Sequence, residues 1–243
     1  MSQSVVPKIR LFLDHPLSAG QSVPLSRDQA HYLFNVMRLG PGDGVLVFDG
    51  RSGEWLARVV LAGKRGGEVL VETRTRTQQD PPDLWLLFAP IKKARTDFIV
   101  EKAAEMGVAR ICPVQTAFTN AERIRRDRLQ AHAVEAAEQC GGTFVPPVEE
   151  IVKLSDLLAT WPGDRQLMFC DEGLAGQGAG LPDLPGPWAI LIGPEGGFSG
   201  EERARLAAMP AAHAVALGPR ILRADTAAVA ALTLWQAALG DWG

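Results

Sequence analysis

The feature that most constrains this chain is a change of pattern after residue 82. From Asp83 onward, short apolar runs alternate with amphipathic helical segments. Strands that alternate with helices indicate a parallel sheet covered by those helices, so we predict an α/β fold for this part. The expected strands are 84–89, 108–113, 167–170, 189–192 and 214–217, and the expected helices are 97–106, 127–140, 199–209 and 225–239.

The residues before this point follow another pattern, with short strands around one helix. Strands are expected at 8–13, 44–49, 54–61 and 68–75, and glycine-rich turns join the last three. Many short strands with such turns favour a small β-barrel. The polar run Thr75–Pro82, which ends in two prolines, reads as a linker. We therefore predict two domains, 1–76 and 77–243.

The one helix of the first domain is predicted over 26–38. Ser26 and Gln29 have the spacing of a capping box, which marks a helix start. Ala30, Leu33, Phe34 and Met37 would form its apolar stripe, and Gly40 would end it with a left-handed backbone. His31, Asn35 and Arg38 form a polar stripe beside the apolar one. A solvated face is the ordinary interpretation of that stripe, and nucleic-acid contact is the alternative.

Charge is distributed unevenly along the chain. Residues 1–78 carry 10 Lys+Arg against 7 Asp+Glu, whereas the rest carry 15 against 21. A basic N-terminal third is a weak indication of a polyanionic partner. The three cysteines, Cys112, Cys140 and Cys170, form no C-x-x-C pair, so we predict no metal site. The start lacks the apolar core of a signal peptide, and the longest apolar run, Leu84–Ile91, is too short to span a bilayer; we therefore expect a cytoplasmic protein without a membrane segment.

Two glycine-bearing loops follow apolar strands. The first, LIGPEGGF over 191–198, lets the backbone approach a ligand closely and offers amide donors. It has neither the P-loop lysine nor the G-x-G-x-x-G spacing, so nucleotide-dependent redox chemistry is disfavoured. A tight strand-to-helix turn is the plain structural alternative.

The second loop is LGPRILRADTAA over 217–228. Asp225 is placed as the N-cap of an alanine-rich helix, and two arginines, Arg220 and Arg223, precede it. They could form a cationic site near a helix N-terminus. A solvated loop, with one arginine paired to Asp225, is the alternative.

Together the two loops resemble the signature of the ribosomal RNA small subunit methyltransferase E family. The resemblance extends over nearly the whole chain, because IRLFL, HYLFNVMRLGPGDGVLVFDG, KKARTDFIVEKAAEMGV and EAAEQCG…VP occur in the family's order. It implies an N-terminal PUA-like barrel that binds RNA and a C-terminal SPOUT domain whose chain forms a deep trefoil knot. Topology rules alone would favour an unknotted sheet. The resemblance further implies a homodimer that methylates N3 of a uridine in 16S ribosomal RNA, with S-adenosyl-L-methionine as cofactor.

On this basis, residues are assigned to three roles. Arg223 is the candidate catalytic residue, because it could stabilise an anionic uracil. Candidate cofactor-binding residues are Ile192, Gly193, Glu195, Gly196, Gly197, Leu217, Gly218, Ile221, Leu222 and Thr226. Candidate RNA contacts are Arg10, His31, Arg38, Lys92, Arg123 and Arg220. His132 and His213 receive no role, and no general base is assigned.

Two positions depart from the family pattern. Asp225 stands where a glutamate is usual, and Gly142 stands where an arginine is common. Two alternative functions also remain: methylation of a different base by an enzyme of the same fold, and a non-catalytic RNA-binding assembly factor. Equilibrium binding of the cofactor would separate an enzyme from a pure binding module.

Overall fold

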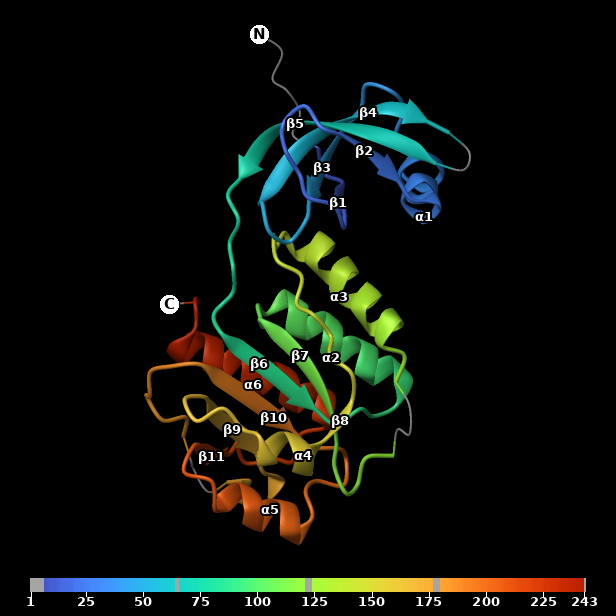
Figure 1. The fold of residues 1–243 in the computed structure, drawn as a ribbon. Coiled ribbons are helices and arrows are strands. Elements are labelled where there is room, and N and C mark those ends of the chain that lie inside the picture. Colours follow the sequence, from blue (N-terminus) through green and yellow to red (C-terminus); the bar gives the residue numbers. More distant parts are fainter. Residues whose placement is uncertain (1–6, 64–65, 121–123, 177–179, 243) are drawn as a thin grey trace. The chain divides into compact units, whose positions relative to one another are not determined.

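The computed structural model describes residues 7–63, 66–120, 124–176 and 180–242, and the chain divides into two compact units (Figure 1). The first unit is Met1–Asp80 together with Ala137–Phe144, and the second is Pro81–Ala136 with Val145–Gly243. The segment Ala137–Phe144 thus packs with the first unit, although the sequence division at 76/77 assigns it to the second domain.

The first unit is a five-stranded sheet beside one helical segment (Figure 1). The strand order is β1-β3-β4-β5-β2, in which β1 runs parallel to β3 and all other pairs are antiparallel. No ladder joins the end strands β1 and β2 within the described residues. An apolar core that includes Leu33, Val45 and Val69 fills the unit. The elements are β1 (Arg10–Phe12), β2 (Ser22–Leu25), α1 (Arg27–Ala30), the π-helical η1 (His31–Val36), β3 (Gly44–Phe48), β4 (Glu54–Ala62) and β5 (Gly67–Arg76).

The helical segment begins as predicted but is not a uniform α-helix. Ser26 and Gln29 form the capping box, and α1 then continues as the π-helix η1. A π-helical turn holds more residues than an α-helical turn, so the apolar stripe does not extend to Met37, which is 40% exposed. The predicted C-terminus is also wrong, because Arg38, with φ of 60°, takes the left-handed conformation expected at Gly40.

Arg10 of β1 is an internal support of the first unit. Its side chain is only 10% exposed, and its Nε donates to Glu54 Oε2 over 2.8 Å. Its remaining hydrogen bonds go to the carbonyl oxygens of Ala137, Glu138 and Gly142 at 2.7–2.9 Å. Four of the five donors of this guanidinium are thereby engaged. These contacts give Arg10 a structural role and leave no room for the RNA contact expected from the sequence.

The second unit is an α/β fold with a wholly parallel six-stranded sheet, which confirms the predicted class (Figure 1). Its strand order is β11-β9-β10-β6-β7-β8. The elements are β6 (Leu84–Phe88), α2 (Lys93–Glu105), β7 (Arg110–Gln115), α3 (Arg126–Cys140), β8 (Val152–Lys153), α4 (Leu154–Ala159), β9 (Gln166–Cys170), the 3-10 helix η2 (Glu172–Leu174), β10 (Trp188–Ile192), α5 (Gly200–Ala207), β11 (Ala212–Val215) and α6 (Ala224–Leu239).

Helices cover both faces of this sheet. Alternate side chains of β6 divide between two cores: Leu86 belongs to the core under α2, α3 and α6, and Leu87 to the core under α4 and α5. The strands are therefore apolar throughout, as in Trp188–Ile192, where every residue is buried. Because α5 and α6 lie on opposite faces, the segment that joins β11 to α6 carries the chain from one face to the other.

Candidate functional site

The carboxyl ends of β9, β10 and β11 form one edge of the sheet. In open parallel sheets, ligands bind outside this edge. Both predicted loops lie here, because they follow β10 and β11. The strand order places β9 between those two strands, so the segment after β9 lies between the two loops.

A cavity of about 280 Å³ is lined by these three segments. Eight of the ten predicted cofactor-binding residues line it: Ile192, Gly193, Glu195, Gly197, Leu217, Gly218, Ile221 and Leu222. Arg220 and Arg223 line it as well. Gly196 and Thr226 do not. A Cβ at Gly196 would face Phe118 at 3.3 Å, and Thr226 is an exposed residue in the first turn of α6.

The loop after β10 owes its shape to glycine. Gly197 has φ of +68°, and its amide closes a turn onto the carbonyl of Pro194 at 2.9 Å. A Cβ at Gly193 would lie 3.1 Å from the buried ring of Phe198, so only glycine fits there without a shift of that ring. The capping box of Ser199 and Glu202 then starts α5, as predicted.

The segment after β9 is the part of the site that the sequence analysis missed. It brings Cys170, Asp171, Glu172 and Ala175 to the cavity wall. Arg203 Nη2 lies 3.1 Å from Asp171 Oδ1 and 3.8 Å from Glu172 Oε1. The sequence did contain one signal, because two acidic residues come directly after an apolar strand, where the carboxyl edge of a parallel sheet begins.

The segments around the cavity are also tied by the main chain. The amide of Gly176 donates to the carbonyl of Gly218 over 3.1 Å, which joins the segment after β9 to the loop after β11. Cys170 contributes an unreactive side chain to the cavity wall, because burial raises the pKa of its thiol to about 12 and keeps the thiol neutral.

The start of α6 differs from the sequence prediction. The N-cap residue is Arg223, and Asp225 lies inside the first turn. Asp225 does face an arginine, but it is Arg95 of α2, with Nε 3.6 Å from Asp225 Oδ2. Arg95 Nη1 also donates to Glu195 Oε1 over 2.7 Å.

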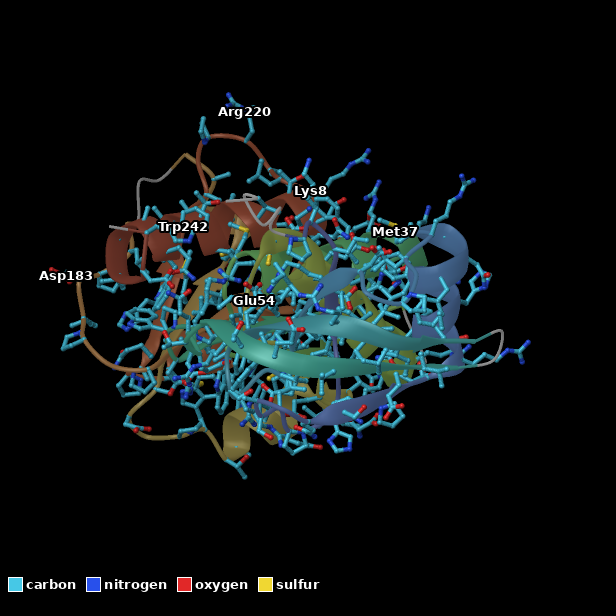
Figure 2. The ribbon with its side chains drawn as sticks, turned by 90° about the horizontal axis from the view of Figure 1, so that it is seen from above. Lys8, Met37, Glu54, Asp183, Arg220 and Trp242 are labelled. Atoms are coloured by element: carbon cyan, nitrogen blue, oxygen red, sulfur yellow. The ribbon has the colours of Figure 1, made fainter. Side chains whose placement is uncertain are left out.

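Arg220 and Arg223 carry the unpaired positive charge of the site. Within the described part of the chain, neither guanidinium has a hydrogen bond or an ion pair. Both residues are exposed, and Figure 2 shows the side chain of Arg220 extending outward from its loop. The acidic residues of the wall come from the other two segments, where Arg203 and Arg95 contact them. The cavity therefore has acidic groups after β9 and β10 and free cations after β11.

The other predicted RNA contacts lie on exposed surfaces of their own units. His31 is exposed and bonded through Nδ1 to Asn35 Nδ2 at 3.0 Å, and Arg38 is exposed at the end of that segment. Lys92 is the exposed N-cap residue of α2. Arg123 lies outside the described residues. Among the described residues there is no group of three or more potential metal ligands, and none of their helices is long and apolar enough to cross a membrane.

Two family models match the chain and identify its class. Residues 78–236 match the model of an RNA methyltransferase domain, and residues 25–72 match that of an RNA methyltransferase PUA domain. The cavity lies within the first match. The chain thus belongs to the RNA methyltransferase class.

Individual relatives narrow this class. Ribosomal RNA small subunit methyltransferase E of Synechocystis is 31% identical over 98% of this chain and 80% of its own length. The enzyme of that name from Rickettsia conorii is 27% identical over 92% of this chain and 93% of its own. The chain belongs to the ribosomal RNA small subunit methyltransferase E family.

Two solved structures share the fold over nearly their full length. The Neisseria gonorrhoeae member, bound to S-adenosyl methionine, has a TM-score of 0.87 at 30% identity and covers 97% of this chain and 99% of its own. A putative methyltransferase of Legionella pneumophila, also in complex with that cofactor, has a TM-score of 0.87 at 28% identity and covers 97% of this chain and 100% of its own.

Proposed function

We propose that this protein methylates N3 of a uridine in 16S ribosomal RNA of the small ribosomal subunit, with S-adenosyl-L-methionine as methyl donor. Family membership supports the ribosomal RNA substrate and the donor. The observation that carries the chemistry is the position of Arg223, an unpaired cation in the wall of the glycine-lined cavity. A ribosomal substrate implies action in the cytoplasm.

The residues of the cavity fit this donor. Its volume of about 280 Å³ lies just below the range of about 300–1,000 Å³ for small-molecule sites. Ile192, Leu217 and Leu222 offer apolar contact for an adenine ring, and the backbones near Gly193 and Gly218 allow close approach. Asp171 and Glu172 supply the negative charge that a sulfonium and an α-amino group favour.

The sulfonium of the donor already activates the methyl group, so the protein acts mainly on the target nucleobase. The N3 of uridine is a poor nucleophile until its imide proton is lost. We assign Arg223 to stabilising the resulting anion, because an opposite charge nearby lowers the pKa of an acid. The proton leaves to solvent. The base must be unpaired or flipped out to enter the site.

The remaining features of the proposal concern the whole chain. We assign the first unit to RNA binding, with His31 and Arg38 as exposed candidate contacts. In the second unit, the candidate contacts are Lys92 at the start of α2 and Arg220 in the cavity wall. The family resemblance leads us to propose a homodimer and a trefoil knot in the second unit.

Nucleoside analysis tests the activity directly. Small ribosomal subunits that lack base methylation are incubated with the protein and labelled donor, and their RNA is digested. We expect label in 3-methyluridine. Label in a different methylated nucleoside would identify another target base, and donor binding without any transfer would indicate an assembly factor. Sedimentation of the protein alone tests the dimer.

A further inference from the structure

Arg95 joins two parts of the cavity that are far apart in sequence. It belongs to the first turn of α2, and one guanidinium contacts two carboxylates: Nη1 lies 2.7 Å from Glu195 Oε1, and Nε lies 3.6 Å from Asp225 Oδ2. Glu195 belongs to the loop after β10 and lines the cavity. Asp225 lies two residues after Arg223, in the first turn of α6.

The backbone of Arg95 is firmly placed. Its neighbour Thr96 is only 4% exposed, and the Thr96 hydroxyl accepts from the amide of Ile91 and donates to the Ile91 carbonyl, both at 3.0 Å. These bonds fix the start of α2. The side chain of Glu195, by contrast, is 49% exposed. Arg95 therefore connects the exposed side chain of Glu195 to the fixed start of α2.

We infer that Arg95 is a positioning residue that sets the distance between the loop after β10 and the start of α6. Through Glu195 it holds one wall of the cavity, and through Asp225 it holds the turn that carries Arg223. This inference rests on the proposed function, since it assumes that the cavity binds the methyl donor. Arginine suits the task because its planar fork reaches two acceptors, whereas lysine is a point charge on a flexible stem.

Arg95 acts on the site more than on the stability of the fold. Its side chain is 28% exposed, and partly exposed ion pairs of this kind contribute little to the free energy of unfolding. We expect Arg95→Ala to melt close to the wild type but to raise the Kd of S-adenosyl-L-methionine roughly two- to fivefold. The single-turnover rate at saturating donor should also fall, because the start of α6 is less well placed. Arg95→Lys should recover part of both losses.

A double-mutant cycle between Arg95 and Glu195 gives the sharpest test. Calorimetry supplies the Kd of the donor for Arg95→Ala, Glu195→Gln and the double variant, and Arg125→Ala is the matched control. Arg125 pairs with Asp127 over 2.7 Å on an exposed surface of the same unit, so its loss removes an ion pair of the same length away from the cavity. If Arg95 acts through Glu195, then Glu195→Gln weakens binding in the wild type and adds nothing in the Arg95→Ala background. The control should bind like the wild type.

Two results would overturn the inference. One is wild-type affinity and single-turnover rate in folded Arg95→Ala. The other is full additivity of the two substitutions, which would mean that Glu195 contacts the donor independently of Arg95. If Arg95→Ala fails to fold, Arg95→Lys and Glu195→Gln carry the same comparison. A wild type that binds the donor but transfers no methyl group would contradict the proposed function and leave the binding cycle intact.

Discussion

At the scale of single residues, Gly197 shows how a backbone requirement limits the sequence at the cavity. Its φ of +68° is costly for other residues, and a Cβ would lie 2.6 Å from Glu172 Oε1. We expect Gly197→Ala to lower donor affinity about tenfold, from a backbone cost of about 1–2 kcal/mol. Gly200→Ala is the control, because Gly200 lacks a positive φ and a Cβ there meets no atom within 4 Å. Equal Kd values for the two variants by calorimetry would remove Gly197 from the binding loop.

Glu54 makes the stability of the first unit depend on pH. Burial alone would raise the pKa of this carboxyl, but hydrogen bonds from Arg76, Arg10 and Thr75 together hold it below its ordinary value of 4.5. A lowered folded-state pKa gives stability that is present above about pH 4.5 and is lost as the pH falls through the folded value. The hydrogen-exchange protection of β4 and β5 should therefore exceed that of Glu54→Gln at neutral pH. The difference should shrink in acid, and a constant difference from pH 7 to pH 3 would contradict this role.

At the scale of elements, the sequence predicts the strands but not their order in the sheet. The alternation of apolar and amphipathic segments predicts the parallel sheet and most of its strands, because burial on both faces demands apolar strands. It does not show that β9 lies between β10 and β11, so Asp171 and Glu172 were missed. Arg95 was missed for a related reason: its two partners are 100 and 130 residues away, and only tertiary structure brings them together.

Predictions of helix ends and of helical period were correct for some elements and wrong for others. Both capping boxes form, because their hydrogen bonds depend on residues three apart. The α-helical period failed at η1, where a π-helical stretch moves Met37 off the apolar face. The residue type of Asp225 predicts an N-cap. The structure gives the cap to Arg223 and uses Asp225 as a partner of Arg95.

Two arginines form hydrogen bonds at the C-terminal end of α3. Arg10 donates to the carbonyl oxygens of Ala137 and Glu138, which lie in the last turn of α3 and which an isolated helix end leaves unpaired. Arg10 and Arg76 also donate to the carbonyl oxygens of Gly142 and Gly141, just beyond the helix. Removal of Arg10 also leaves Glu54 buried with one cation fewer. We expect Arg10→Ala to destabilise the first unit by about 3 kcal/mol. Arg58→Ala, which breaks an ion pair that is 45% and 29% exposed, should have a much smaller effect, because solvent screens exposed pairs. Hydrogen-exchange rates of the β1 and β4 amides measure the loss of stability in both variants. Equal losses in Arg10→Ala and Arg58→Ala would contradict the structural role of Arg10.

At the scale of the whole molecule, we propose that the two units have different roles. The described residues that line the cavity, the proposed donor site, all belong to the second unit. The N-terminal 78 residues carry a net positive charge, whereas the rest of the chain is net negative, as expected if the first unit contributes to RNA binding. The central claim is that Arg223, at the start of α6, stabilises the anion of the target uridine.

Single-turnover methylation by the wild type and by Arg223→Ala across pH, at saturating donor, tests this claim most directly. If the anion reacts, the rate should rise with pH below the effective pKa of the bound imide, and Arg223 should lower that pKa. Arg223→Ala should then slow transfer by roughly 10²–10³ at neutral pH, with donor affinity nearly unchanged. It should recover part of its rate at high pH, where the uridine ionises unaided, and Arg223→Lys should be intermediate. A parallel offset that is independent of pH would contradict the account, because Arg223 would then only position the RNA.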